Sequence, residues 1–387
     1  MRNDNGAPIL MVVYVDDLII MSSNGEAVDE FLQQLRSRFP LDTPDTLPRW
    51  SNTTLGQYEQ RLLGFVLHVE HGPTQTIVRL SHREKLEKIL TSARENDELC
   101  RMLDKQRHRK TPLPAGPKGV TPVNEPKGDL LDPVRHKVYR SLVAGLLYIS
   151  IICRPDLCPS VNVLSKFVAR PAQADWAALC YLLEYVQSNT NFYLTWTFPR
   201  SNDGLTVGTK VLYNDANWSS PHSDVTNNSG HSRSGFAAVY RHTDLQGTTI
   251  ENLVGWCCKT QANISLSSTD AEVVSAGLGA RKLVSWQNVL TELFLSQIFI
   301  HATSWKVTML VDCKPCKAIV CAECSLKAVR HLDLALLFCR RAHDDGRIIV
   351  TWIPRIDNLG DYFCTAAPRT IQEFELRKPR LVQFAKY

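Results

Sequence analysis

The order of strand and helix patterns in the second half of the chain limits its fold more than any other feature of the sequence. A long helical pattern, from about Thr269 to Leu295, follows three alternating apolar and polar runs, and strand and helix patterns then alternate. Consecutive strands pair antiparallel through short loops, whereas strands separated by helices can pair in parallel. The pattern therefore predicts a mixed α/β domain over residues 205–370. Its first three strands are expected at Leu205–Tyr213, Gly235–Tyr240 and Leu253–Lys259.

The first half of the chain has different patterns. Two strand-like runs, Ile9–Val15 and Leu18–Met21, are separated by Asp16 and Asp17, as in a hairpin with an acidic turn. Residues 103–134 are rich in Lys, Pro and Gly and indicate a linker. Composition shifts then divide the chain into four parts: 1–102, a linker and helical region over 103–200, the mixed α/β domain over 205–370, and a basic tail over 371–387.

Composition indicates an ordinary folded protein in the cell interior. Of the 387 residues, 44% are hydrophobic and 21% are charged, and no apolar run reaches the ~20 residues that span a bilayer. Twelve cysteines without a secretory leader favour reduced thiols, so we expect a cytoplasmic or nuclear protein with no membrane partner. The net charge of +5 is mild, but basic residues gather at 105–110 and again at 377–380. Each basic zone could contact nucleic acid or simply be solvated.

Four acidic residues lie where a metal site would need them. Asp215 and Asp312 are expected at strand ends, Glu272 in the first turn of the long helix, and Asp361 at the start of a last short helix. Carboxylates placed in this way can converge above a sheet, and hard divalent cations prefer such oxygen ligands. The alternatives are structural: Glu272 completes a capping box with Thr269, and the aspartates are common turn and helix-start residues. Spacing alone leaves both interpretations open.

Two CxxC pairs form a competing constellation. Cys313 and Cys316 are separated by only four residues from Cys321 and Cys324, which is shorter than the loop of most zinc sites. The cysteines also follow helical spacing, which favours packing on one helix face over a zinc site.

The strings around the four carboxylates resemble the RNase H domain of Ty1/copia-type retrotransposon Pol polyproteins. They are NDANW at 214–218, HSRSGFAAVY at 231–240, GWCCKTQANISLSSTDAE at 255–272, LVDCKPCKAI at 310–319, RHLDLALLF at 330–338 and NLGD at 358–361. In the first half, YVDDLII at 14–20 resembles the reverse transcriptase palm motif, and residues 138–167 resemble the segment that joins reverse transcriptase to RNase H. The resemblance covers nearly the whole chain and implies a truncated palm and thumb or connection region followed by an RNase H-like domain.

The resemblance also implies an activity. Asp215, Glu272, Asp312 and Asp361 match the family's metal-binding carboxylates, which would hold two Mg²⁺ ions, or Mn²⁺, and cleave the RNA strand of an RNA/DNA hybrid. Contacts to the 2′-hydroxyls and to the hybrid's shape would provide selectivity. Other Pol products and components of the capsid particle are further implied partners. Residues expected to contact nucleic acid are Lys105, Arg107, Arg109, Lys110, Ser232 and Arg233, whereas Trp218 and Trp256 are expected in the core.

Departures from the family pattern keep an alternative open. Asn217, Val273 and Cys313 replace the Asp, the aromatic residue and the Asn that are usual at these positions. They leave every matched ligand in place but suggest a drifting copy, so the alternatives are a nucleic-acid-binding fragment without activity and a copy without selected function. Asp16 and Asp17 would be a residual polymerase metal site or only a hairpin turn. Because the chain begins just before them, we do not expect it to synthesise DNA on its own.

Overall fold

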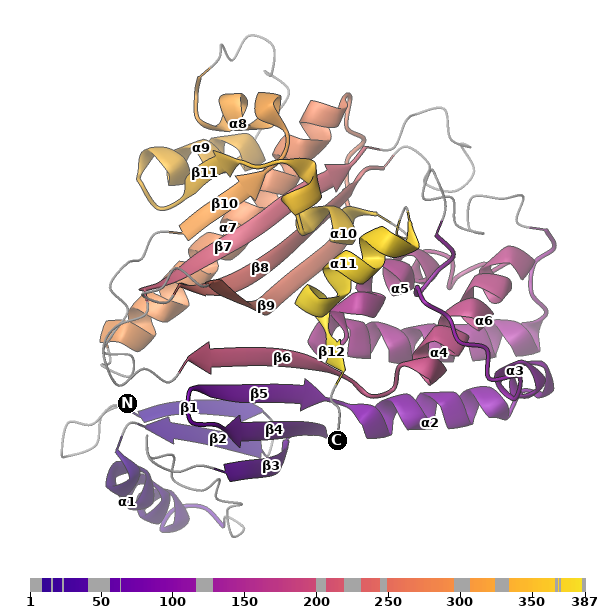
Figure 1. The fold of residues 1–387 in the computed structure, drawn as a ribbon, viewed down its shortest axis with the longest axis horizontal. Helices are drawn as coiled ribbons and strands as arrows, with labels where there is room; N and C mark the ends of the chain where they lie inside the picture. The colour runs from indigo at the N-terminus through magenta and orange to yellow at the C-terminus, as the bar shows by residue number, and fades with distance from the viewer. Residues whose placement is uncertain are drawn as a thin grey trace.

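In the computed structural model, the described residues form three sheets (Figure 1). Two sheets have five strands each, and the third is a two-stranded hairpin. None of the helices within the described ranges is long and apolar enough to cross a bilayer. The structure describes residues 9–14, 17–22, 24–40, 56–62, 64–115, 128–199, 207–218, 231–243, 249–295, 307–323, 334–365, 368 and 370–384.

The first half forms a hairpin, an antiparallel sheet and a group of helices. In the hairpin, β1 and β2 pair antiparallel with Tyr14 opposite Asp17, which confirms the predicted hairpin. Helix starts follow capping rules: the Asn96 side chain accepts hydrogen bonds from two backbone amides of α3, and Asp132 does the same for α4. The strands are β1 (Ile9–Tyr14), β2 (Asp17–Ser22), β3 (Gly56–Leu62), β4 (Phe65–His71), β5 (Gln75–Ser81) and β6 (Phe192–Pro199), and the helices are α1 (Gly25–Arg36), α2 (Arg83–Arg94), α3 (Asp97–Leu103), α4 (Pro133–Ile152), the 3₁₀ helix η2 (Pro155–Leu157), α5 (Cys158–Ser165) and α6 (Gln173–Ser188).

The second half forms the predicted mixed sheet, with strand order β11-β10-β7-β8-β9. The three consecutive strands β7, β8 and β9 are antiparallel, and β10 joins the other side of β7 in parallel, followed by β11. The elements are β7 (Val207–Asn217), β8 (Arg233–Thr243), β9 (Thr249–Thr260), α7 (Ser268–Leu295), β10 (Val307–Val311), α8 (Lys314–Val320), α9 (Leu334–Asp344), β11 (Ile349–Trp352), the 3₁₀ helix η4 (Arg355–Asp357) and α10 (Gly360–Cys364).

Strand alternation divides the packing of this sheet between two cores. On β7, Leu212 is buried in a cluster with residues of α7, α8 and α9, whereas Val211 and Tyr213 belong to a larger cluster. That larger cluster also contains Leu146 of α4 and Leu182 of α6. Successive side chains on a strand point to opposite faces, so the helices of the first half cover one face of the second sheet. The hydrophobic core is therefore continuous across residue 200, and the domain boundaries predicted from the sequence stay a prediction.

The end of the chain returns to the first sheet. The sequence predicts a basic tail over 371–387, but its described part forms helix α11 (Ile371–Leu381) and strand β12 (Gln383–Phe384). Phe374 and Leu381 are buried, so this segment packs as part of the core. β12 pairs antiparallel with β6, which in turn pairs with β5, so the first sheet has the order β12-β6-β5-β4-β3.

A buried ion pair lies between the helices of the first half and α10. Arg154 donates two hydrogen bonds to the Asp156 carboxylate, at 2.8 and 2.7 Å, and the side chains are 1% and 0% exposed. The Tyr185 hydroxyl donates to Asp156 Oδ2 at 3.0 Å, and the Tyr362 hydroxyl donates to the Asp156 main-chain oxygen. Arg154 also donates to the carbonyl of Asn189 at 3.0 Å. The network satisfies a charge that would be costly to bury alone.

We expect Asp156→Ala to lower the free energy of unfolding by about 3–5 kcal/mol, because it leaves the Arg154 guanidinium buried without a counter-charge. Denaturant titration followed by circular dichroism measures the change. Asp104→Ala is the matched control, because Asp104 pairs with Arg94 on the surface at 2.7 Å with 62% of its side chain exposed, and its loss should cost less than about 1 kcal/mol. Equal costs for the two variants would contradict the assigned role of the buried pair.

Candidate metal centre

Three of the four predicted carboxylates meet at one end of the second sheet. Asp215 lies near the end of β7, and Asp312 directly follows Val311 of β10, which pairs with Asn214 in parallel register. Glu272 is in the first turns of α7, which packs on β7. Carboxylate oxygens of these three residues lie within 4.8 Å of one another. The parallel pairing of β7 and β10 thus places Asp215 and Asp312 side by side at the ends of neighbouring strands, and the start of α7 adds Glu272.

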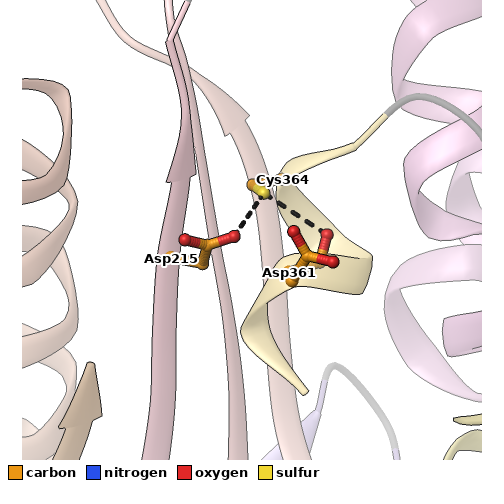
Figure 2. Close-up of side chains that lie close together, drawn as sticks. All are labelled: Asp215, Asp361 and Cys364. Carbon is orange, nitrogen blue, oxygen red and sulfur yellow. Dashed lines mark hydrogen bonds between the residues drawn. The ribbon is translucent and has the colours of Figure 1, made fainter. Parts of the chain in front are cut away.

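Asp361 reaches the other side of Asp215 because α10 packs very closely on the sheet. Gly235 is opposite Asp215 on β8, and a Cβ atom there would overlap the backbone of Phe363 and Cys364. Gly360 makes a similar approach, because its Cβ would lie 2.9 Å from the Tyr213 carbonyl oxygen. Figure 2 shows the result: Asp215, Asp361 and Cys364 lie together, and the Cys364 thiol donates to Asp215 Oδ2 at 2.9 Å.

Two arginines hold the Asp361 carboxylate. Arg355 Nη2 donates to Oδ1 at 2.6 Å, and Arg377 Nη1 of α11 donates to Oδ2 at 2.9 Å. Arg377 is buried and also pairs with Glu373, whereas half of the Arg355 side chain is exposed. Charge-assisted bonds of this kind fix the orientation of a carboxylate.

The electrostatics of the cluster are dominated by burial. Burial and the carboxylates of Asp312 and Asp361 raise the pKa of Asp215 to about 8. Burial and Asp215 raise the pKa of Glu272 to about 11. Burial also raises the pKa of Asp312, although Arg355 opposes the shift. Four carboxylates and two arginines together carry an excess of two negative charges, which requires bound protons or a cation.

The donor set fits a hard divalent cation. Glu272 is 7% exposed, and its Oε2 accepts no hydrogen bond from any donor that the structure describes. A buried carboxylate oxygen without a donor is costly unless something else satisfies it. Mg²⁺ and Mn²⁺ bind such oxygens, and Asp215, Glu272 and Asp312 are the residues that would hold one. Asp215 also belongs to the second group, with Asp361 and Cys364, whose ligand atoms lie within 4.8 Å of one another.

The residues predicted to contact nucleic acid are not all available for it. Lys105, Arg107 and Lys110 are exposed. Arg109 instead donates to the buried Glu184 carboxylate at 2.6 Å and lies 4.2 Å from the centre of the Tyr181 ring. Its side chain is therefore engaged within the protein, because Glu184 is only 2% exposed and needs a counter-charge.

Of the two other residues predicted to contact nucleic acid, one is buried and one is partly accessible. Ser232 is fully buried, whereas Arg233 is half-buried at the start of β8, and its Nε makes no hydrogen bond within the described segments. In the proposed polymerase remnant, Asp16 lies outside the described residues, and Asp17 begins β2.

The second basic zone, at the end of the chain, contacts the protein itself. Arg377 binds Asp361, Arg380 donates to Glu251 at 2.6 Å, and Lys378 lies 4.6 Å from the centre of the Phe192 ring. These contacts argue against the expectation that this zone binds nucleic acid, because its side chains are engaged with partners within the protein.

Aromatic and cysteine residues show what the sequence could and could not predict. Trp218 was expected in the core, but it is 39% exposed and donates from Nε1 to the Ser265 carbonyl, because β7 ends just before it. Trp256 is half-buried against the larger core and donates to the Ser150 carbonyl. Cys316 is fully buried among apolar side chains, as the helix-packing interpretation predicts, and Cys324 lies outside the described residues.

The sequence interpretation missed Cys364, Arg355 and Arg377 as neighbours of Asp361. One signal was available for Cys364, because positions i and i+3 share a helix face, which places it beside Asp361 on α10. The two arginines carry no such signal, since one lies in a 3₁₀ helix and the other on a separate helix.

Gly235→Ala tests the close packing of α10. The added methyl group would overlap α10 backbone, which should displace the helix and lower the free energy of unfolding by about 1–3 kcal/mol. Hydrogen exchange of the α10 amides should rise in parallel. Gly145→Ala is the control, because its Cβ would meet only the Ile89 side chain, at 3.1 Å, within a helix that favours alanine. A Gly235→Ala protein with unchanged α10 protection would show that the contact does not position the helix.

The strand order and the carboxylates at the β7 and β10 ends define an RNase H-like domain. No family model matches the chain. Solved RNase H domains from Mycobacterium tuberculosis and Halobacterium salinarum align with 44% and 39% of this chain and 96% and 90% of their own, at 13% and 10% identity and TM-scores of 0.28 and 0.26. The fold assignment rests on the topology and not on these alignments.

Several curated proteins are similar to most of the chain. The retrovirus-related Pol polyprotein from transposon TNT 1-94 of Nicotiana tabacum is 25% identical over 373 residues, which are 96% of this chain and 24% of that protein. The Pol polyprotein from transposon RE1 of Arabidopsis thaliana is 26% identical over 94% of this chain and 21% of its own length. A secreted RxLR effector protein of Plasmopara viticola is 33% identical over 153 residues, 40% of this chain and 93% of that protein. The chain is thus similar over 91–96% of its length to retrovirus-related Pol polyproteins of copia-type plant retrotransposons, and it spans about a fifth to a quarter of the length of those relatives.

Proposed function

We propose that the RNase H-like domain hydrolyses the RNA strand of RNA/DNA hybrids with divalent metal ions. The observation that supports this most directly is the cluster of the buried Asp215 and Glu272 with the half-buried Asp312, whose oxygens lie within 4.8 Å of one another. These three residues and Asp361 are the proposed site residues, and residues 205–370 are the proposed catalytic unit. We do not propose DNA synthesis by this chain.

The proposed roles follow from position. Mg²⁺ or Mn²⁺, when bound, would lower the pKa of a coordinated water and neutralise charge on the phosphodiester. Asp215 belongs to both ligand groups and would be shared by two cation positions. The Ser275 hydroxyl donates to the Asp215 main-chain oxygen at 2.8 Å and so ties the start of α7 to β7. This bond holds the first turns of α7, which carry Glu272, next to Asp215 on β7.

A basic pair is the proposed contact to the nucleic-acid backbone. Lys166, just after α5, lies near Arg233 on β8, and burial together with Arg233 lowers the Lys166 pKa to about 8. Two close cations attract a phosphate group, which would satisfy both. Lys166 belongs to the helices of the first half and Arg233 to the sheet that carries the carboxylates. A nucleic-acid strand bound to this pair would therefore contact the helices and the sheet.

Asp215→Asn should reduce cleavage of a labelled RNA/DNA hybrid in Mg²⁺ by about two orders of magnitude or more, because it removes charge from the shared ligand. Mg²⁺ or Mn²⁺ binding, measured by calorimetry on the same protein, should weaken as well. Asp345→Asn is the control, because Asp345 is an exposed carboxylate that follows α9. Equal cleavage by the parent and Asp215→Asn would refute the site assignment.

One observation favours the alternative of a binding module without activity. Both oxygens of Asp361 already accept bonds from arginines, which leaves this carboxylate less available to a cation. A chain that binds hybrids without cutting them would still use Arg233 and the exposed side chains of Lys105, Arg107 and Lys110.

Both candidate functions predict salt-dependent binding at the basic pair. Arg233→Gln should weaken hybrid binding and reduce the slope of log affinity against log salt by about 1, because one phosphate contact is lost. Fluorescence anisotropy over a salt series measures the slope. Arg341→Gln, with an 86% exposed side chain on α9, should leave it unchanged. An unaltered slope in Arg233→Gln would exclude this arginine from the interface.

A further inference from the structure

A tryptophan on β11 adjoins the candidate metal centre. Trp352 pairs with Val311 of β10 in parallel register, and Asp312 directly follows Val311. The indole Nε1 of Trp352 donates to the main-chain oxygen of Asp312 at 3.0 Å. The next amide, that of Ile353, donates to the Val311 oxygen at 2.9 Å. These two bonds fix the indole beside the strand end that carries a proposed metal ligand.

The indole of Trp352 lies at the surface and not in the core. β11 is an edge strand of the second sheet, and Trp352 is 38% exposed, whereas Val350 on the same strand is 5% exposed. Ile356, which follows in η4, is 68% exposed. The hydrogen bond to Asp312 satisfies the one polar atom of the indole, so the exposed part of Trp352 is apolar. Exposed apolar side chains beside a polar site are typical of surfaces that contact a ligand.

Cations accompany this ring. Lys314, the first residue of α8, is exposed, and its Nζ lies 4.7 Å from the centre of the Trp352 ring. An ammonium group is attracted to the face of an aromatic ring. Because Lys314 is exposed, the ring face that it covers is on the solvent side. Arg355, three residues after Trp352, adds a second cation with 52% of its side chain exposed. An aromatic face and two cations therefore lie next to the carboxylates.

The combination of a ring face and an ammonium group has a definite ligand preference. Proteins that bind single-stranded nucleic acid use cations that contact phosphates and aromatic side chains on which bases stack. Bases within a duplex stack on one another, so only an unpaired base offers a free face to an indole. We propose that Trp352 and Lys314 bind an unpaired nucleotide of a strand that continues from the candidate metal centre. Its base would stack on the indole, and its phosphate would contact the ammonium group.

Binding exchanges one non-covalent contact for two. The base takes the position of the Lys314 ammonium over the ring, and the ammonium moves to the phosphate. A cation–π contact at an exposed site is weak, whereas the contact between an ammonium and a phosphate is charge-assisted. The preferred nucleic acid is then a hybrid with a single-stranded extension. A matching preference in cleavage rests on the proposed nuclease function, but binding of the nucleotide does not.

Fluorescence anisotropy in EDTA, where no metal supports cleavage, measures the binding. The probes are a labelled blunt RNA/DNA hybrid and the same hybrid with an unpaired thymidine extension, placed in turn at each end of each strand. The full chain should bind one extended hybrid about tenfold more tightly than the blunt hybrid. Trp352→Ala should lose this advantage, whereas Trp352→Phe should keep most of it, because phenylalanine retains a ring for stacking. Phe338→Ala is the matched control, because Phe338 on α9 is 36% exposed, and it should keep the advantage.

The lysine is tested by salt dependence. Lys314→Gln should reduce the slope of log affinity against log salt by about 0.7 for the extended hybrid and leave the slope for the blunt hybrid unchanged. Lys88→Gln, at an exposed position on α2, should change neither slope.

Three results would overturn the proposal in variants that melt cooperatively. They are equal affinity of the parent for all extended and blunt hybrids, an unchanged advantage in Trp352→Ala, and equal losses in Trp352→Ala and Trp352→Phe. The last result would assign the effect to the hydrogen bond with Asp312 and not to stacking. Cleavage of the same hybrids in Mg²⁺ is measured separately. If no protein cleaves, the proposed nuclease function fails while the anisotropy data still decide the nucleotide site.

Discussion

The buried pair of Arg154 and Asp156 is the constraint on which the rest of the structure depends. Both charges are almost fully removed from water, so their partners are fixed by the cost of leaving a charge unsatisfied. The main chain of Asp156 is also bound, because the Tyr362 hydroxyl, 206 positions later in the chain and next to Asp361, donates to its carbonyl oxygen. The helix that carries the fourth carboxylate is thus held from the first half of the chain. The candidate metal centre is therefore a property of the whole molecule, although its carboxylates come from the second half alone.

Close backbone packing and buried charge act together at the centre. Gly235 and Gly360 let α10 approach β7 and β8, which places Asp361 and Cys364 beside Asp215. The same approach excludes water and raises the pKa of Asp215, so the cluster must hold protons or a cation. Arg355 and Arg377 bond directly to Asp361, and Arg355 also opposes the upward pKa shift of Asp312. The remaining negative charge lies between β7, β10 and α7, where a hard cation is proposed.

The sequence predicted those parts of the molecule that local patterns determine. Alternating runs gave the antiparallel strands and the long helical pattern gave α7, while the convergence of Asp215, Glu272 and Asp312 followed from parallel pairing of β7 and β10. Other features depend on tertiary contacts without a local signal. A two-residue strand such as β12 has no periodicity, and the partners of Asp361 come from separate helices. The functional roles of the carboxylates stay a prediction.

Pairing of β12 with β6 has a consequence for biosynthesis. β6 lies between β5 and β12 in the first sheet, but β12 leaves the ribosome only after the whole second sheet has been made. At translation rates of about 5–20 residues per second, one edge of β6 is without its partner for on the order of ten seconds or more. Unpaired strand edges are templates for association with other chains. Nascent chains of this protein thus pass through a period in which premature contact with a neighbour competes with closure of the first sheet.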